Sequence, residues 1–168
     1  NFAKGLAHVQ KGNLAASRHC LVSLESILQD SLLAIRLMPF NAPVQCGRIA
    51  AGILNGELYY AEGKITNAIN AFKEAVAEED RLIYREPQEW LIPARQYLGA
   101  YLLKTKQIAA AENAYREDLV ANPGNGWSLL GLYNCSIARH KKSEAAKYKI
   151  LYRKAFKNAD VSPVASVF

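Results

Sequence analysis

Two clusters of carboxylates come closest to a catalytic pattern in this chain. They are Glu78, Glu79 and Asp80 in one segment and Glu117 and Asp118 in another. Paired carboxylates act as general acid and base when a cleft holds them together. Neighbouring charges are more typical of a solvated helix face, and we favour that interpretation for both clusters.

The histidines, cysteines and glycines form no metal-binding or nucleophilic pattern either. His19 and Cys20 are adjacent, so on a helix they point about 100° apart and do not readily converge on one metal ion. Gly47, Gly52 and Gly56 are not followed by Lys-Ser or Lys-Thr at the spacing of a phosphate-binding loop. We therefore expect a protein that is not an enzyme, with no catalytic residue, no cofactor and no metal ion.

The composition is that of an ordinary globular domain. The chain has 168 residues, of which 51% are hydrophobic and 21% charged, and no Pro-rich or Gly/Ser-rich linker interrupts it. We expect one domain over residues 1–168. The chain begins at Asn1 and not at Met, which is consistent with a part of a longer or processed protein. No apolar run reaches the ~18 residues that a membrane-spanning helix needs.

The cysteines favour a reducing compartment. Cys20, Cys46 and Cys135 are odd in number and lie 26 and 89 residues apart, which fits neither a disulfide framework nor a metal knuckle. Each is better interpreted as a small core residue. A cytoplasmic location follows as the expectation, with export as the alternative because the start of the chain does not exclude processing.

The net charge of +6 is concentrated near the C-terminal end. From Trp127 onward there are eight basic residues against Glu144 and Asp160, whereas residues 1–126 are neutral. Basic helices bind nucleic acids or anionic surfaces, and this is the alternative function. The basic residues spread around the predicted last helix without an aromatic stacking platform, so we expect no nucleic acid partner.

Small and large residues recur at fixed intervals. Gly56 is followed by Ala68 after 12 residues and by Phe72 after 4 more. The same intervals connect Gly99, Ala111 and Tyr115, and a weaker copy connects Gly5, Ser17 and Leu21. Two antiparallel helices approach closely where small residues face each other, and a large residue one turn later fills the gap beside them. We expect Gly56 to face Ala68 in this way, and Gly99 to face Ala111.

A last copy begins at Trp127, where the sequence reads W-x2-L-G. Ser143 stands at its expected small position, with Ala145 and Ala146 just beyond, which suggests a longer turn between the two helices. In these residues the chain resembles the tetratricopeptide repeat family. The resemblance implies an all-α solenoid of about four helix hairpins, which is a right-handed superhelical array of about eight helices. We expect no strand and place the helices at residues 2–10, 14–36, 44–62, 65–80, 88–104, 108–121, 126–139 and 143–159.

The resemblance also implies a binding surface. In this family the first helix of each hairpin lines a concave groove that receives a segment of a partner protein. Carried over by position, that groove would contain Glu57, Tyr60, Gln96, Lys104, Asn125 and Ser128. The Lys, Arg and Asn clamp with which some members hold a chain terminus is not reproduced. The expected function is a scaffold that binds an unidentified protein or peptide.

The segment 81–95 is the most distinctive part of the chain. It contains Tyr84, Trp90 and Arg95, which are residue types favoured at binding hot spots, and we expect them at the rim of the groove. The alternative is that Tyr84 and Trp90 fill a wide gap between repeats. Pro87 would open the next helix and Pro93 would lie early inside it.

Overall fold

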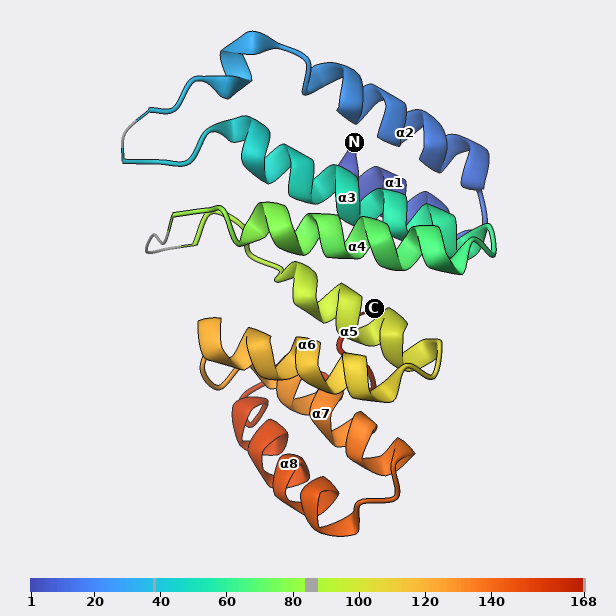
Figure 1. Cartoon of the computed structure of the whole chain (residues 1–168), viewed down its shortest axis with the longest axis vertical. Helices are drawn as coiled ribbons and strands as arrows, with labels where there is room; N and C mark the ends of the chain where they lie inside the picture. Colours follow the sequence, from blue (N-terminus) through green and yellow to red (C-terminus); the bar gives the residue numbers. More distant parts are fainter. Residues whose placement is uncertain (38, 84–87, 168) are drawn as a thin grey trace. The chain divides into compact units, whose positions relative to one another are not determined.

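The computed structural model describes residues 1–37, 39–83 and 88–167, in which helices are the regular secondary structure (Figure 1). No strand occurs in these residues, which confirms the all-α fold class. None of the described helices is both long enough and apolar enough to pass through a membrane. The helices are α1 (Phe2–Gln10), α2 (Leu14–Ile27), the short 3-10 helix η1 (Ser31–Ala34), α3 (Pro43–Ala61), α4 (Ile65–Glu79), α5 (Ala94–Lys104), α6 (Ile108–Ala121), α7 (Gly126–Ala138) and α8 (Lys142–Ala155).

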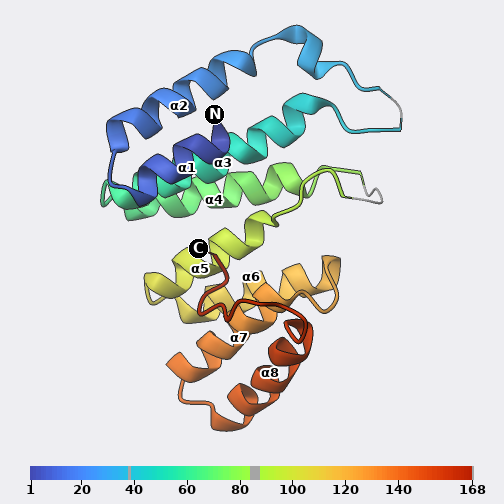
Figure 2. The ribbon, with the colours of Figure 1, turned by 180° about the vertical axis from the view of Figure 1, so that it is seen from behind.

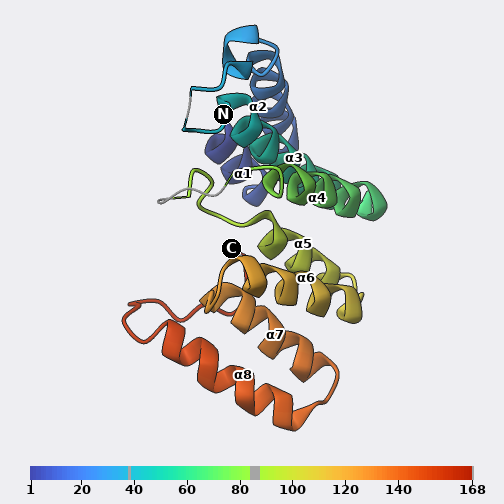
Figure 3. The same cartoon turned by 60° about the vertical axis from the view of Figure 1, so that its left-hand side comes forward.

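The chain divides into two compact units. Unit 1 is Asn1–Ala94 and unit 2 is Arg95–Phe168. In unit 1, α1 packs on α2, α3 packs on α4, and α3 also contacts α1 and α2. In unit 2, α7 packs on both α6 and α8, and the α7–α8 hairpin is seen from the side in Figure 3.

Four turns with the same backbone geometry join α1 to α2, α3 to α4, α5 to α6, and α7 to α8. Each contains one residue with positive φ, namely Gly12, Gly63, Lys106 and His140 at 71°, 76°, 63° and 56°. The amide of the next residue donates to the carbonyl five residues before it, as from Asn13 to His8 at 2.9 Å and from Lys141 to Ser136 at 2.9 Å. This is the Schellman arrangement that ends helices.

A small buried residue follows each of these turns. Ser17, Ala68, Ala111 and Ala145 lie five residues after the residue with positive φ and are at most 4% exposed. In the last copy Ser143, which stands at the position expected from the spacing, is exposed, and Ala145 takes the buried place. The turn is not longer than the others.

Large side chains cover the glycines of the first helices. An ideal Cβ on Gly56 would lie 2.5 Å from the ring of Phe72, and one on Gly99 would lie 2.5 Å from the ring of Tyr115. Gly131 of α7 also faces Tyr115. The predicted partners of these glycines were alanines, whereas the nearest side chains are the aromatic residues one turn further on. Ala68 and Ala111 are buried as expected.

Most predicted helices agree with the structure at both ends, but three are too long. The expected helix 14–36 stops at Ile27, because the carboxylate of Asp30 accepts a hydrogen bond from the Leu32 amide at 2.9 Å and begins η1. The last helix also ends earlier than predicted, at Ala155.

The expected helix 88–104 begins only at Ala94. Pro93 disfavours helical geometry in the residue before it, so the helix starts after the proline and not around it. Glu79, the last residue of α4, accepts a hydrogen bond from the Ala94 amide at 2.6 Å. The carboxylate thus satisfies one of the amides that a helix start leaves free. The predicted role of Pro87 lies outside the described residues.

One hydrophobic cluster of unit 1 lies between α1, α2 and α3, and further fully buried residues, such as Ile53 and Phe72, lie in α3 and α4. Cys20, Leu21, Leu54 and Leu58 are buried in this cluster, and the partly buried residues packed against them are Phe2, Leu6, Val9, Leu14 and Ala51. All three cysteines are free. Cys20 and Cys135 are buried as expected for core residues, whereas Cys46 is half-buried. Burial raises the pKa of the Cys135 thiol to about 12.

Candidate protein-binding surfaces

Unit 1 contains a groove with a volume of about 460 Å³. It is formed by the C-terminal half of α2, the middle of α3 and the C-terminal half of α4. The residues that line it are Glu25, Leu28, Gln29, Arg48, Ala51, Gly52, Asn55, Glu74, Ala75 and Glu78. None of them was predicted as a site residue. The groove lies between the second helices of two hairpins, whereas the sequence placed a groove along the first helices.

Small residues make the floor of this groove. An ideal Cβ on Gly52 would lie 3.0 Å from the Cβ of Ala75 and 3.4 Å from the carbonyl oxygen of Ala71, so α3 and α4 are in close contact here. Leu28 covers Gly47 and thereby fixes the end of α2 against α3. These small residues leave open space between α2 and α4, which Arg48 and Asn55 of α3 also line.

Charged residues make the walls. Three glutamates and one arginine line the groove, which gives it a net charge of −2. Glu78 is paired with Arg81. Glu25 and Glu74 are exposed and make no ion pair with any described residue. The groove is thus acidic, and its potential favours a cationic ligand.

In unit 2, two of the predicted groove residues hold a buried carboxylate instead. Asp118 of α6 is fully buried and accepts hydrogen bonds from Ser128 and from Asn125 at 2.8 Å. Asn122 also donates to it, at 2.9 Å. Asn125 additionally caps α7 by accepting from the Trp127 amide at 3.1 Å. The interpretation of Asp118 as part of a solvated face is wrong, because it ties the end of α6 to the start of α7.

The other predicted groove residues differ in exposure. Glu57 is 3% exposed and Gln96 is 4% exposed, so their side chains offer little surface. Tyr60 is half-buried, and Lys104 is exposed with its ammonium 4.3 Å from the ring centre of Tyr101. Tyr60, Lys104 and Asn125 are the predicted groove residues with accessible surface.

The two predicted rim residues that the structure describes make different contacts. Trp90 lies 5.6 Å from Phe2 between ring centres, and its Nε1 donates to the Ile92 carbonyl at 2.6 Å. This contact supports the alternative that Trp90 fills a gap. Arg95 lies 3.4 Å from Glu117 and is largely buried. Tyr84 lies outside the described residues.

A segment that the sequence analysis did not single out lies against α5, α6 and α7. We call residues 160–167 the tail segment; it follows α8 and returns along unit 2 (Figure 2). Ser166 and Val167 are 3% and 8% exposed. No hydrophobic periodicity marks these residues in the sequence, so their position depends on tertiary contacts.

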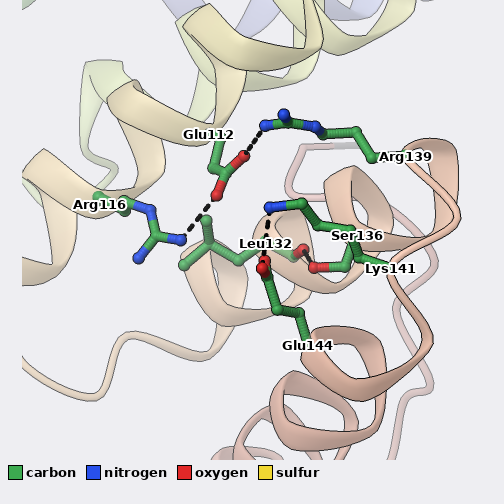
Figure 4. A network of polar contacts seen from close by, with 7 residues as sticks. All are labelled: Glu112, Arg116, Leu132, Ser136, Arg139, Lys141 and Glu144. Carbon is green, nitrogen blue, oxygen red and sulfur yellow. Dashed lines mark hydrogen bonds and ion pairs between the residues drawn. The ribbon is translucent and has the colours of Figure 1, made fainter.

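The polar contacts between α6 and the α7–α8 turn are structural (Figure 4). Glu112 of α6 lies 2.6 Å from Arg116 and 2.8 Å from Arg139. Hydrogen bonds, first of all from Arg116, lower the pKa of the Glu112 carboxyl. Lys141 pairs with Glu144 at 2.8 Å. No group of three His, Cys, Asp or Glu side chains in the described part of the chain is arranged to hold a metal ion.

Comparison with protein-family models and with curated proteins identified no relative of the chain. No protein-family model matches the chain, and no curated protein is significantly similar to it. The class that the structure defines is therefore an all-helical protein in which consecutive helices are joined by four equivalent turns.

Proposed function

We propose that this chain is a non-enzymatic scaffold of the tetratricopeptide type that binds a segment of a partner protein. The observation that carries the proposal is the groove between α2, α3 and α4. Its volume of about 460 Å³ lies within the ~300–1,000 Å³ typical of ligand pockets. Its wall carries two exposed glutamates that have no ionic partner among the described residues.

The repeated hairpins support the class of protein. The four turns share one hydrogen-bond pattern, and each is followed by a buried small residue at the same distance. Arrays of such hairpins stack into surfaces that bind extended peptides or helices. The tetratricopeptide assignment rests on this recurrence together with the W-x2-L-G motif at Trp127.

The charge of the groove supports the chemistry of the partner. Glu25 of α2 and Glu74 of α4 line the groove together with the small residues Ala51, Gly52 and Ala75, and Arg48 is the one cation among the lining residues. A lysine or arginine side chain could place its aliphatic part on the small residues and its charge near a glutamate carboxylate. The proposed partner segment is therefore basic.

Selection of peptides tests the proposal. A random peptide display library is selected against the chain, and the affinity of the enriched peptides is measured by fluorescence anisotropy. We expect peptides with lysine or arginine, and we expect Glu25→Arg with Glu74→Arg to weaken binding tenfold or more at an unchanged melting temperature. Thr66→Arg with Asn70→Arg, which adds two arginines at exposed positions of α4 outside the groove, is the control.

The same peptides distinguish between the two surfaces. If Tyr60→Ala and Lys104→Glu abolish binding and the groove variants do not, the binding surface is the one predicted along the first helices. If no peptide is enriched, or if enriched peptides bind all variants equally, the proposed groove function is wrong.

A further inference from the structure

The tail segment is bound to unit 2 as a peptide ligand would be. It has no helix or strand of its own among its described residues, and Figure 2 shows it returning from the end of α8 across the unit. Its attachment uses two hydrogen-bonded sites, at Ser166 and at Val164.

Ser166 takes part in a directional chain of hydrogen bonds. Its hydroxyl donates to the Gln96 carbonyl at 3.2 Å and lies 2.6 Å from the Tyr115 hydroxyl. A serine hydroxyl has a single proton, so Tyr115 must be the donor in the shorter contact. Ser166 thus satisfies a buried tyrosine of α6 and a main-chain carbonyl of α5 at once.

The second hydrogen-bonded site binds the main chain of the tail segment. Asn134 of α7 donates from its side-chain amide to the Val164 carbonyl at 3.0 Å. The Val164 side chain is 85% exposed, so this contact recognises the backbone and not the side chain. Val167, which is 8% exposed, adds one buried aliphatic group.

The helices that the tail segment contacts are held together by packing that does not involve the tail segment. The ring of Tyr115 lies against Gly99 of α5 and Gly131 of α7, and α7 packs on α6 and α8. Only Ser166 and Val167 of the tail segment are buried. Because only these two residues of the tail segment are buried, the segment should open locally without unfolding the unit.

We infer that the face formed by Gln96, Tyr115 and Asn134 is a second peptide-binding site, which this chain fills with its own tail segment. The partner is an extended segment in which a small hydroxyl residue is followed by an aliphatic residue, as in Ser166-Val167. It binds by displacing the tail segment. The inference rests on the proposed function as a scaffold but concerns a different site. Since a tethered ligand acts at an effective concentration of about 1 mM, a free segment competes poorly while the tail segment is bound.

The test uses the full chain and a labelled, end-capped synthetic peptide of residues 160–167. Ser166→Arg places a charge where the buried serine lies and should release the tail segment. Ser162→Arg changes an exposed residue of the same segment and is the matched control. We expect Ser166→Arg to bind the peptide saturably and at least tenfold more tightly than the wild type or Ser162→Arg. A peptide with alanine in place of Ser166 should bind at least tenfold more weakly than the native peptide.

Two results would overturn the inference: no peptide binding by a folded Ser166→Arg chain, or equal binding by that variant and the wild type. If Ser166→Arg does not fold, hydrogen exchange of the wild-type chain decides. The amides of residues 164–167 should exchange well before those of α5, α6 and α7, and simultaneous exchange would contradict a displaceable tail. Glu25→Arg with Glu74→Arg should leave this binding unchanged, so failure here is distinct from failure of the proposed groove.

Discussion

At the residue scale, each turn between paired helices requires a residue with positive φ, and two of the four turns avoid the steric strain of this conformation by using glycine. Gly12 and Gly63 adopt positive φ without a steric penalty, whereas Lys106 and His140 hold the same conformation with a side chain. A left-handed conformation costs a residue other than glycine about 1–2 kcal/mol. The recurrence of the turn despite this cost indicates that the geometry of the hairpin requires it.

Substitution at Lys106 tests this account. We expect Lys106→Gly to raise the free energy of unfolding by about 0.5–1 kcal/mol. Removing the steric strain at positive φ should stabilise the folded state by more than the added conformational entropy of glycine stabilises the unfolded state. Lys106→Ala is the control, since it removes the same side chain and keeps the strain. Urea denaturation measures both variants, and a glycine variant less stable than the alanine variant would refute the account.

Asp118 offers a second residue-scale prediction. Asp118→Ala should lower the free energy of unfolding by about 2–4 kcal/mol, because the Ser128, Asn125 and Asn122 donors lose their common acceptor. Glu117, the exposed neighbour of Asp118, provides the control. Glu117→Ala should change the free energy of unfolding by less than about 0.5 kcal/mol. Thermal denaturation of both variants measures the difference. Equal effects would mean that the buried carboxylate does not stabilise the α6–α7 junction.

At the element scale, α8 carries exposed cations without a surface for stacking bases. Lys147, Lys149, Arg153 and Lys154 are exposed. The nearby aromatic rings pack on each other, Tyr133 against Tyr152 at 5.3 Å and Trp127 against Phe156 at 5.1 Å. Base stacking provides much of the affinity for single strands, so only screened charge attraction remains.

Binding to nucleic acid should therefore be weak and sensitive to salt. We expect fluorescence anisotropy with a labelled duplex to show binding at low ionic strength that disappears near ~0.15 M salt. Anionic vesicles should behave in the same way. Sub-micromolar, sequence-selective binding at physiological salt would instead establish the nucleic-acid function that the charge distribution first suggested.

Helix positions were predictable from the sequence because they depend on local signals. Gly63, followed five residues later by Ala68, marks a turn and a contact that hold in the structure. Two helix ends, near Asp30 and at Pro93, were predicted wrongly. Each depends on a side-chain hydrogen bond to a backbone amide that the sequence pattern does not reveal. The groove of unit 1 and the tail site were not predictable, since each depends on how residues of several separate segments meet.

At the scale of the whole molecule, the two units differ in net charge and in whether their candidate binding surface is open or occupied. Residues 1–94 contain nine basic and ten acidic residues, whereas residues 95–168 contain twelve basic and five acidic residues. Unit 1 has an open acidic groove, and unit 2 has a face already occupied by the tail segment. A basic partner segment is thus attracted to the unit that is not itself strongly cationic.

The central claim is that the groove of unit 1 binds a basic partner segment, and nuclear magnetic resonance tests it most directly. A selected peptide is titrated into isotopically labelled chain. We expect the largest amide shifts at Ala51, Gly52, Asn55 and Ala75, and we expect Asn55→Trp, which fills the groove, to abolish them at an unchanged melting temperature. Binding that leaves these amides unmoved, or that persists in Asn55→Trp, would contradict the claim.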